Sequence, residues 1–230
     1  MLRHNSSMLP SALGILVVCG ALVSCGGPDQ KALDSYLKAV KSKDKVAMAA
    51  VSAVDFPETV QSWQVIEMNP ETVEPCPLKD MARTLREAEM DLKYLAEKDY
   101  LFLSDNQHHY KRYKAQLEKD PDTEFSGELA EFHEEYTDIR SKATEAEKAV
   151  ETAKRAYERE KMAAGISLMG GTATPAMDGD VAVRVARVNV TTSAGEKPYR
   201  ITLKNYKLVN PESQAKMRSR WIVTSVEEGT

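Results

Sequence analysis

The sequence predicts an α+β protein in which a small curved antiparallel sheet with N-terminal helices carries a long inserted helical hairpin. Three observations support this fold class. Apolar residues recur at helical spacing from Asp29, they recur every three or four residues over much of 78–164, and three β-like runs follow residue 178. The length of 230 residues allows one domain or two small ones.

The composition indicates a folded and mildly acidic protein. Charged residues make up 29% of the chain, and the formal net charge is −4. The regular apolar positions exclude a wholly disordered chain, and the acidic balance gives no electrostatic reason to bind nucleic acid. The sequence offers no polybasic patch for anionic lipid, so any membrane anchor is expected to be hydrophobic.

The first 25 residues are typical of an export signal. Arg3 precedes an apolar run at 13–23, which is too short to span a bilayer. The run ends in Leu-Val-Ser-Cys at 22–25, which resembles the lipobox of bacterial lipoproteins. The resemblance implies cleavage of a signal peptide (1–24), a diacylglycerol on the thiol of Cys25 and a fatty acid such as palmitate on its new amino group. An ordinary secretory leader and an uncleaved anchor are the alternatives.

This resemblance also implies a location. The lipid on Cys25 would hold the mature chain on the membrane of the cell envelope. Gly26 and Gly27 follow the cysteine, without an aspartate at the second mature position. In a bacterium with two membranes, that pattern implies the periplasmic face of the outer membrane. Residues 25–30 form the tether, and its five residues after the cysteine span at most about 17 Å. The folded part is therefore expected close to the membrane.

Two helices and a strand are predicted in the first third of the mature chain. Four apolar residues share one face of a helix that starts at Asp29: Leu33, Tyr36, Leu37 and Val40. Asp44 is a plausible N-cap for a second helix to about Val51. A short strand is expected at 63–68, where Asn69-Pro70 ends it.

Three further strands are predicted near the C-terminus, at 180–192, 198–209 and 217–226. The apolar alternation of the first run changes phase between Val185 and Val188, and that of the second changes between Leu203 and Tyr206. Because successive side chains of a strand point to opposite faces, each change predicts a bulge or a swap of the buried face. The sheet is therefore expected to bend strongly.

This order of elements carries a second resemblance. A helix pair broken at 41–44, a strand, and a meander ending in Arg-Trp-Ile-Val at 220–223 resemble the NTF2-like (cystatin-like α+β) domains of small bacterial lipoproteins. The resemblance covers about half of the mature chain and implies a curved sheet around the helices. The domain would comprise 31–69 and 178–230, with 70–177 inserted. Three independent segments are the alternative.

The inserted segment predicts a coiled-coil hairpin with helices at about 78–119 and 123–164 and a flexible return linker. One antiparallel register pairs Leu117 with Phe125 near a turn at Pro121, and Leu85 with Tyr157 near the base. Small residues make the second helix slim: Ala143, Ala146, Ala149, Ala153 and Ala156. They allow close packing within the hairpin, or leave room for a third helix from another copy.

Few residues suggest chemistry. His109, His133 and Glu134 are weak candidates for metal ligands across the hairpin, although nothing fixes a fourth ligand. Cys76 is the one mature thiol besides Cys25, and we expect it to be buried or inert. No catalytic motif and no cofactor-binding motif are found, so we expect no enzyme and no cofactor.

The expected function is therefore that of a membrane-anchored envelope lipoprotein, a non-enzymatic protein-interaction or scaffold module that acts through its helical hairpin. The partner would be another envelope protein. Residues 78–163 hold 21 acidic and 16 basic side chains, which favours a basic partner. The alternative is a module that binds a small apolar ligand in a cavity of the sheet.

Overall fold

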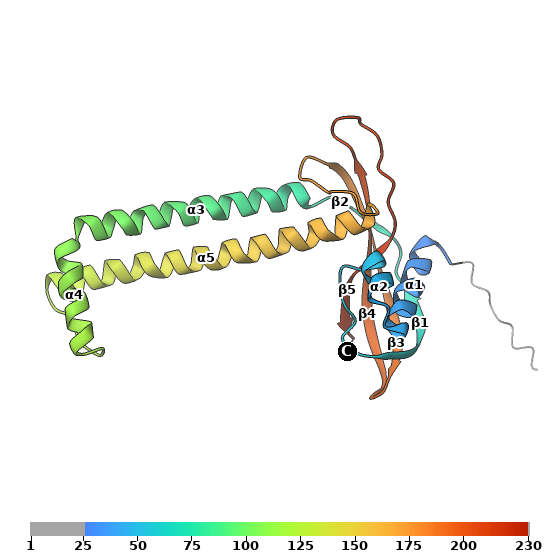
Figure 1. Cartoon of the computed structure of the whole chain (residues 1–230), viewed down its shortest axis with the longest axis horizontal. Coiled ribbons are helices and arrows are strands. Elements are labelled where there is room, and N and C mark those ends of the chain that lie inside the picture. The colour runs from blue at the N-terminus through green and yellow to red at the C-terminus, as the bar shows by residue number, and fades with distance from the viewer. Residues whose placement is uncertain (1–25, 230) are drawn as a thin grey trace, which may run out of the picture.

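The computed structural model describes residues 26–229, so the predicted signal peptide and Cys25 lie outside the described residues. Within this range the fold mixes helices with an antiparallel, open sheet of five strands (Figure 1). The helices are α1 (Pro28–Ser42), α2 (Lys45–Val51), α3 (Leu78–Asp105), α4 (Gln107–Lys119) and α5 (Glu128–Ser167). The strands are β1 (Val60–Met68), β2 (Thr72–Pro75), β3 (Asp178–Thr192), β4 (Gly195–Val209) and β5 (Ile222–Glu228).

Both N-terminal helices are confirmed. The predicted apolar face of α1 is buried, with Leu33, Tyr36 and Leu37 fully inaccessible to solvent. Asp44 caps α2 as expected, because its carboxylate accepts a 2.9 Å hydrogen bond from the backbone N–H of Ala47. The chain thus enters the sheet from a fixed helical pair.

The strands run in the order β1-β3-β4-β5, and β2 also pairs with β3. The predicted strands at 63–68, 180–192 and 198–209 are confirmed. The predicted start of the last strand at 217 is wrong, since β5 begins at Ile222. Instead, the Asn210 side chain organises a turn by accepting bonds from the N–H groups of Glu212 and Ser213. β2 is a short, exposed strand that the sequence pattern did not reveal.

The β3–β4 ribbon changes its buried face half-way along, as the phase changes predicted. Its register runs without a shift from Asp178↔Val209 to Thr192↔Gly195, so the cause is a swap of faces and not a bulge. Neighbouring residues such as Val181 and Ala182 therefore belong to two different apolar clusters. One cluster lies beneath α1, and the other lies against α3 and α5.

Helices α3 and α5 lie side by side in antiparallel directions and project from the sheet (Figure 1). We call α3, α4, α5 and their connections the helical arm. The expected continuous helix over 78–119 is wrong, because the chain leaves helical geometry at Asn106. The Asn106 amide donates a 3.0 Å hydrogen bond to the carbonyl of Phe102, a local bond that competes with helix continuation. The second long helix begins at Glu128, not at 123.

A polar network fixes the base of the arm to the sheet. Glu160 of α5 accepts hydrogen bonds from the Lys204 ammonium at 2.7 Å and from the Tyr206 hydroxyl at 2.6 Å. Side chains of Glu160 and Lys204 are only 12% and 23% exposed. Burial, together with the charge of Glu160, holds the pKa of Tyr206 far above its usual range. We call these three residues the Glu160 network.

Buried hydrogen bonds also attach the C-terminal end of α5 to the sheet. Ser167 is fully buried, and its hydroxyl donates to the carbonyl of Arg220 at 2.7 Å and accepts from the N–H of Tyr206 at 3.1 Å. The return segment that follows buries Leu168 and Ala173 in the second cluster. It is therefore packed against the sheet and differs from the flexible linker that was predicted.

Replacement of Glu160 tests this attachment. Glu160→Ala is expected to lower the free energy of unfolding by about 2–4 kcal/mol, because Lys204 and Tyr206 lose their shared acceptor inside the protein. Denaturant unfolding measures this change. The matched control is Glu158→Ala, an exposed residue of the same helix whose ion pair with Lys161 is long at 3.7 Å. The control should cost less than about 1 kcal/mol, and equal losses in the two variants would contradict the network.

Candidate interaction surface

The helical arm points away from the start of the described chain. In Figure 1 the tip of the arm and the N-terminal end of α1 lie at opposite ends of the long axis of the molecule. Helix α5 alone has 40 residues, which corresponds to about 60 Å. A tether at the N-terminal end would therefore leave the whole arm free to meet a partner.

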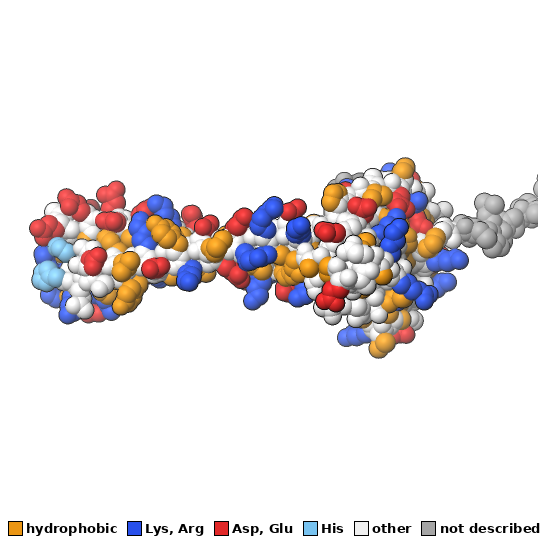
Figure 2. Space-filling model, turned by 90° about the horizontal axis from the view of Figure 1, so that it is seen from above, with side chains coloured by type: hydrophobic (Ala, Val, Ile, Leu, Met, Phe, Trp, Pro, Cys, Tyr) orange, Lys and Arg blue, Asp and Glu red, His pale blue; other side chains and the backbone are white. Residues whose placement is uncertain are grey.

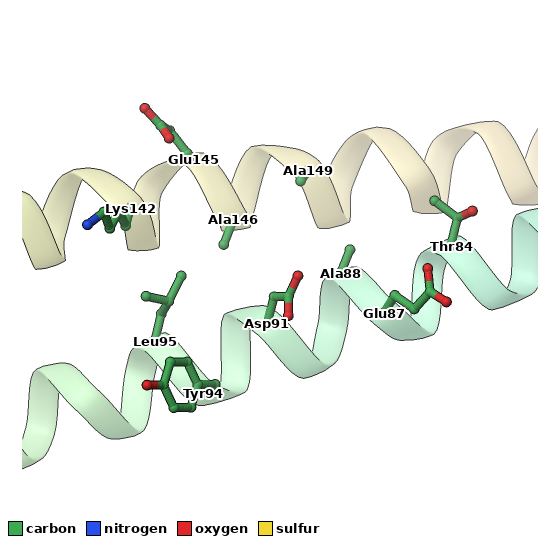
Figure 3. Close-up of a pocket in the computed structure, with 10 residues that line it drawn as sticks. All are labelled: Thr84, Glu87, Ala88, Asp91, Tyr94, Leu95, Lys142, Glu145, Ala146 and Ala149. Carbon is green, nitrogen blue, oxygen red and sulfur yellow. The ribbon is translucent and has the colours of Figure 1, made fainter.

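A groove of about 630 Å³ runs between α3 and α5 in the middle of the arm. Its walls combine Ala88 and Leu95 of α3 with Ala146 and Ala149 of α5. Ala88, Leu95 and Ala146 are directed toward the space between the helices (Figure 3), and Ala149 is exposed at the edge of the groove. Because alanine side chains are short, the two helices leave this space unfilled. Three carboxylates and one ammonium border it: Glu87, Asp91, Glu145 and Lys142.

Large apolar side chains of α3 continue from the groove onto the outer face of the arm. Met90, Tyr94 and Leu101 are 62%, 67% and 51% exposed, and Tyr94 also lines the groove. Their spacing of four and seven residues places them on one side of the helix. This second stripe was not predicted, because the heptad spacing indicates only the stripe that packs between the helices.

The rest of the arm surface is charged and largely self-compensating. Acidic and basic side chains alternate along it, with apolar patches between them (Figure 2). Several ion pairs connect neighbouring turns, including Lys142 with Asp138 at 2.7 Å and Arg83 with Asp80 at 2.9 Å. Exposed pairs of this kind contribute little to stability. They keep the arm soluble while the groove stays apolar.

An aromatic cluster closes the tip of the arm. Phe132 of α5 is only 5% exposed, and it stacks on Phe102 of α3 with 5.3 Å between ring centroids. Tyr113 of α4 lies 5.6 Å from the same ring and 4.9 Å from Phe125. The cluster explains why α4 turns across α5: rings from three helices then share one packed centre.

The histidine candidates His109 and His133 lie in this aromatic cluster. His109 stacks on Phe132 at 6.2 Å, and His133 stacks on Tyr113 at 5.5 Å. Glu134 is exposed. Within residues 26–229, no group of three or more His, Cys, Asp or Glu side chains is placed to hold a metal ion. Aromatic packing is the structural role that these rings have.

Of the two cysteines predicted in the mature chain, the structure describes only Cys76. Cys25, the predicted lipidation site, lies outside the described residues. Cys76 is free and partly buried, next to the apolar cluster at the base of the arm. Burial raises the pKa of its thiol, which keeps the thiol protonated and a poor nucleophile at neutral pH.

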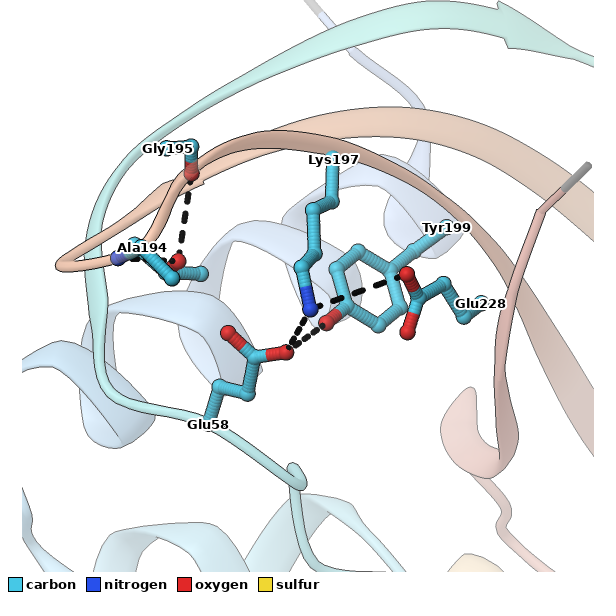
Figure 4. A network of polar contacts seen from close by, with 7 residues as sticks. Glu58, Ala194, Gly195, Lys197, Tyr199 and Glu228 are labelled. Carbon is cyan, nitrogen blue, oxygen red and sulfur yellow. Dashed lines mark hydrogen bonds and ion pairs between the residues drawn. The ribbon is translucent and has the colours of Figure 1, made fainter.

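A second polar network lies near the β3–β4 turn, which is at the end of the sheet remote from the arm (Figure 1). Figure 4 shows this network from close by. Glu58 accepts hydrogen bonds from the Lys197 ammonium at 2.5 Å and the Tyr199 hydroxyl at 3.1 Å. Glu228 lies 3.6 Å from the same ammonium. The bond from Lys197 lowers the pKa of Glu58, and the network ties the segment before β1 to β4. It has the features of a structural contact.

Comparisons with known proteins were negative: no family model matches the chain, and neither the curated proteins nor the solved structures gave a match. In the described part of the chain, no helix has the length and apolar character needed to cross a bilayer.

Phe132→Ala tests the tip cluster. The substitution is expected to cost about 3–5 kcal/mol, because it removes a buried ring that contacts three helices. Hydrogen exchange at the backbone amides of α4 should accelerate with it, since α4 loses its main contact. Tyr100→Ala is the control, because Tyr100 is 72% exposed. Unchanged exchange in α4 after Phe132→Ala would show that the cluster does not hold this helix.

Glu58→Gln tests the second network through pH. The folded state holds the pKa of Glu58 below its ordinary value of 4.5, so ionised Glu58 stabilises the fold at neutral pH. This contribution is lost as the pH falls through the depressed pKa. The variant should therefore unfold at a lower denaturant concentration than the parent at pH 7, and the two midpoints should converge in acid. A gap between the variant and the parent that stays constant with pH would contradict the assignment.

Proposed function

We propose that this protein is a lipid-anchored lipoprotein of the bacterial cell envelope and acts as a non-enzymatic interaction module. Its lipid would be attached to Cys25, next to the NTF2-like α+β domain. The coiled-coil hairpin inserted in that domain, which corresponds to the helical arm, would present the groove between α3 and α5 to another envelope protein.

The groove is the observation that supports this proposal most. The two helices leave a space unfilled between Ala88 and Ala146, and the adjoining Ala149, Met90 and Tyr94 are exposed. Exposing large apolar side chains beside a groove costs solubility, and such patches mark interaction sites in soluble proteins. Among the described residues, no arrangement of side chains supports a catalytic centre to the same degree.

The shape and charge of the groove favour one kind of partner. A third helix with a narrow apolar face would fill the space above the alanines, as in helix-in-groove recognition. Glu87, Asp91 and Glu145 outnumber Lys142 around it, so basic residues beside that apolar face would be attracted. The expected partner is therefore an amphipathic helix with basic flanks.

Photo-crosslinking in native membranes tests this proposal. A photoreactive residue at position 94 of the full chain is expected to capture one defined envelope protein. The capture should be lost in Ala149→Glu, which adds a carboxylate to the groove wall. Ala96→Glu makes the same change on an exposed alanine of α3 outside the groove, and it should leave the capture intact. Equal capture by both variants, or capture by neither the parent nor the control, would rule out the groove as the docking site.

A further inference from the structure

A second pocket, of about 410 Å³, lies beside α1 at the end where the described chain begins. It is lined by Pro28, Lys31, Ala32 and Ser35 of α1, Val51 of α2, Asn205 of β4, and Ser219, Arg220 and Trp221 before β5. Two of these side chains are cations and none is a carboxylate. That is unusual for a chain with a net charge of −4.

The positive charge in this pocket has no acidic counterpart. Lys31 is an exposed residue of α1 and forms no ion pair with any described residue. Arg220 donates from Nε to the carbonyl of Ile166 at 3.3 Å, so its described partner is a neutral group at the end of α5. No ion pair joins its guanidinium to a carboxylate of residues 26–229. Two uncompensated cations in one pocket favour an anion.

Neutral donors and an apolar wall complete the pocket. The Ser219 hydroxyl donates to Oδ1 of Asn205 at 2.7 Å, which leaves the amide N–H groups of Asn205 as donors. Ser35 adds an exposed hydroxyl. Ala32, Val51 and Trp221 form the apolar side. A ligand with an anionic, oxygen-rich group next to an apolar portion matches this arrangement.

We propose that this pocket binds the phosphate-bearing headgroup of an anionic phospholipid, with Lys31 and Arg220 as the cations that recognise it. The proposal rests on the proposed membrane attachment for its source of phosphate. Pro28 lies three residues after Cys25, a distance that an extended chain covers in about 10 Å. A lipid on Cys25 would therefore place the pocket at the headgroup layer.

Binding to vesicles tests the pocket without the anchor. The chain from residue 26 onward retains all the described helices and strands, so it can be used without the predicted lipid. It is expected to float with vesicles that contain phosphatidylglycerol and not with vesicles of phosphatidylcholine alone. Lys31→Ala and Arg220→Gln should each weaken binding about fivefold, the effect of one cation at an anionic surface.

Matched variants separate a site from general charge attraction. Lys38→Ala removes an exposed lysine from the same helix, and Arg218→Gln removes a nearby arginine, but neither residue lines the pocket. Both should keep nearly the parental binding. Arg220→Lys should restore most of what Arg220→Gln loses, and thermal unfolding confirms that each variant is folded. Equal losses in all four charge-removing variants would overturn the site.

Soluble glycerol phosphate separates the two sources of phosphate. If it binds far more weakly than the vesicles, with the same dependence on Lys31 and Arg220, the ligand is a lipid headgroup. If it binds as tightly as the vesicles, the lipid assignment is overturned. Because the arm takes no part in this assay, failure here leaves the groove proposal standing, and failure of the groove experiment leaves the pocket standing.

Discussion

The swap of the buried face along the β3–β4 ribbon is the constraint on which the rest of the structure depends. A strand pair with one apolar face needs one packing partner to bury that face. In this ribbon the apolar side chains of the two halves point to opposite faces, so two packing partners are needed. Helix α1 covers one half, and the base of the arm covers the other. The long helices are therefore part of the core at their base, and removing them would expose Val181, Tyr206 and Leu208.

The attachment of the arm determines what its free part can do. At the base, buried polar contacts through Glu160 and Ser167 fix the direction of α5 relative to the sheet. At the tip, an aromatic cluster joins the three helices of the arm. Between these two fixed points lies the stretch with small side chains and the groove. A groove held open from both ends is preorganised for a partner, which lowers the entropic cost of binding.

The sequence predicted the parts of the fold that depend on local periodicity. The cap at Asp44, the apolar face of α1 and the phase changes in β3 and β4 could all be read from neighbouring residues. The helix break at Asn106 was harder to predict, because the coiled-coil spacing becomes irregular after Asp99 without stopping. The pocket beside α1 could not be predicted at all. Lys31 and Arg220 lie far apart in the sequence, and only the folded sheet brings them together.

The central proposal is that the groove between α3 and α5 is occupied by a partner helix when the protein is anchored, as we propose, to an envelope membrane. Hydrogen exchange, measured on the protein in native membranes and again after purification, tests this claim most directly. The account predicts slower exchange in the membrane sample at 84–95 of α3 and 142–149 of α5, which border the groove. The amides of α1 and the sheet core, already buried, serve as the internal reference. Identical exchange of the groove segments in both samples would contradict the account.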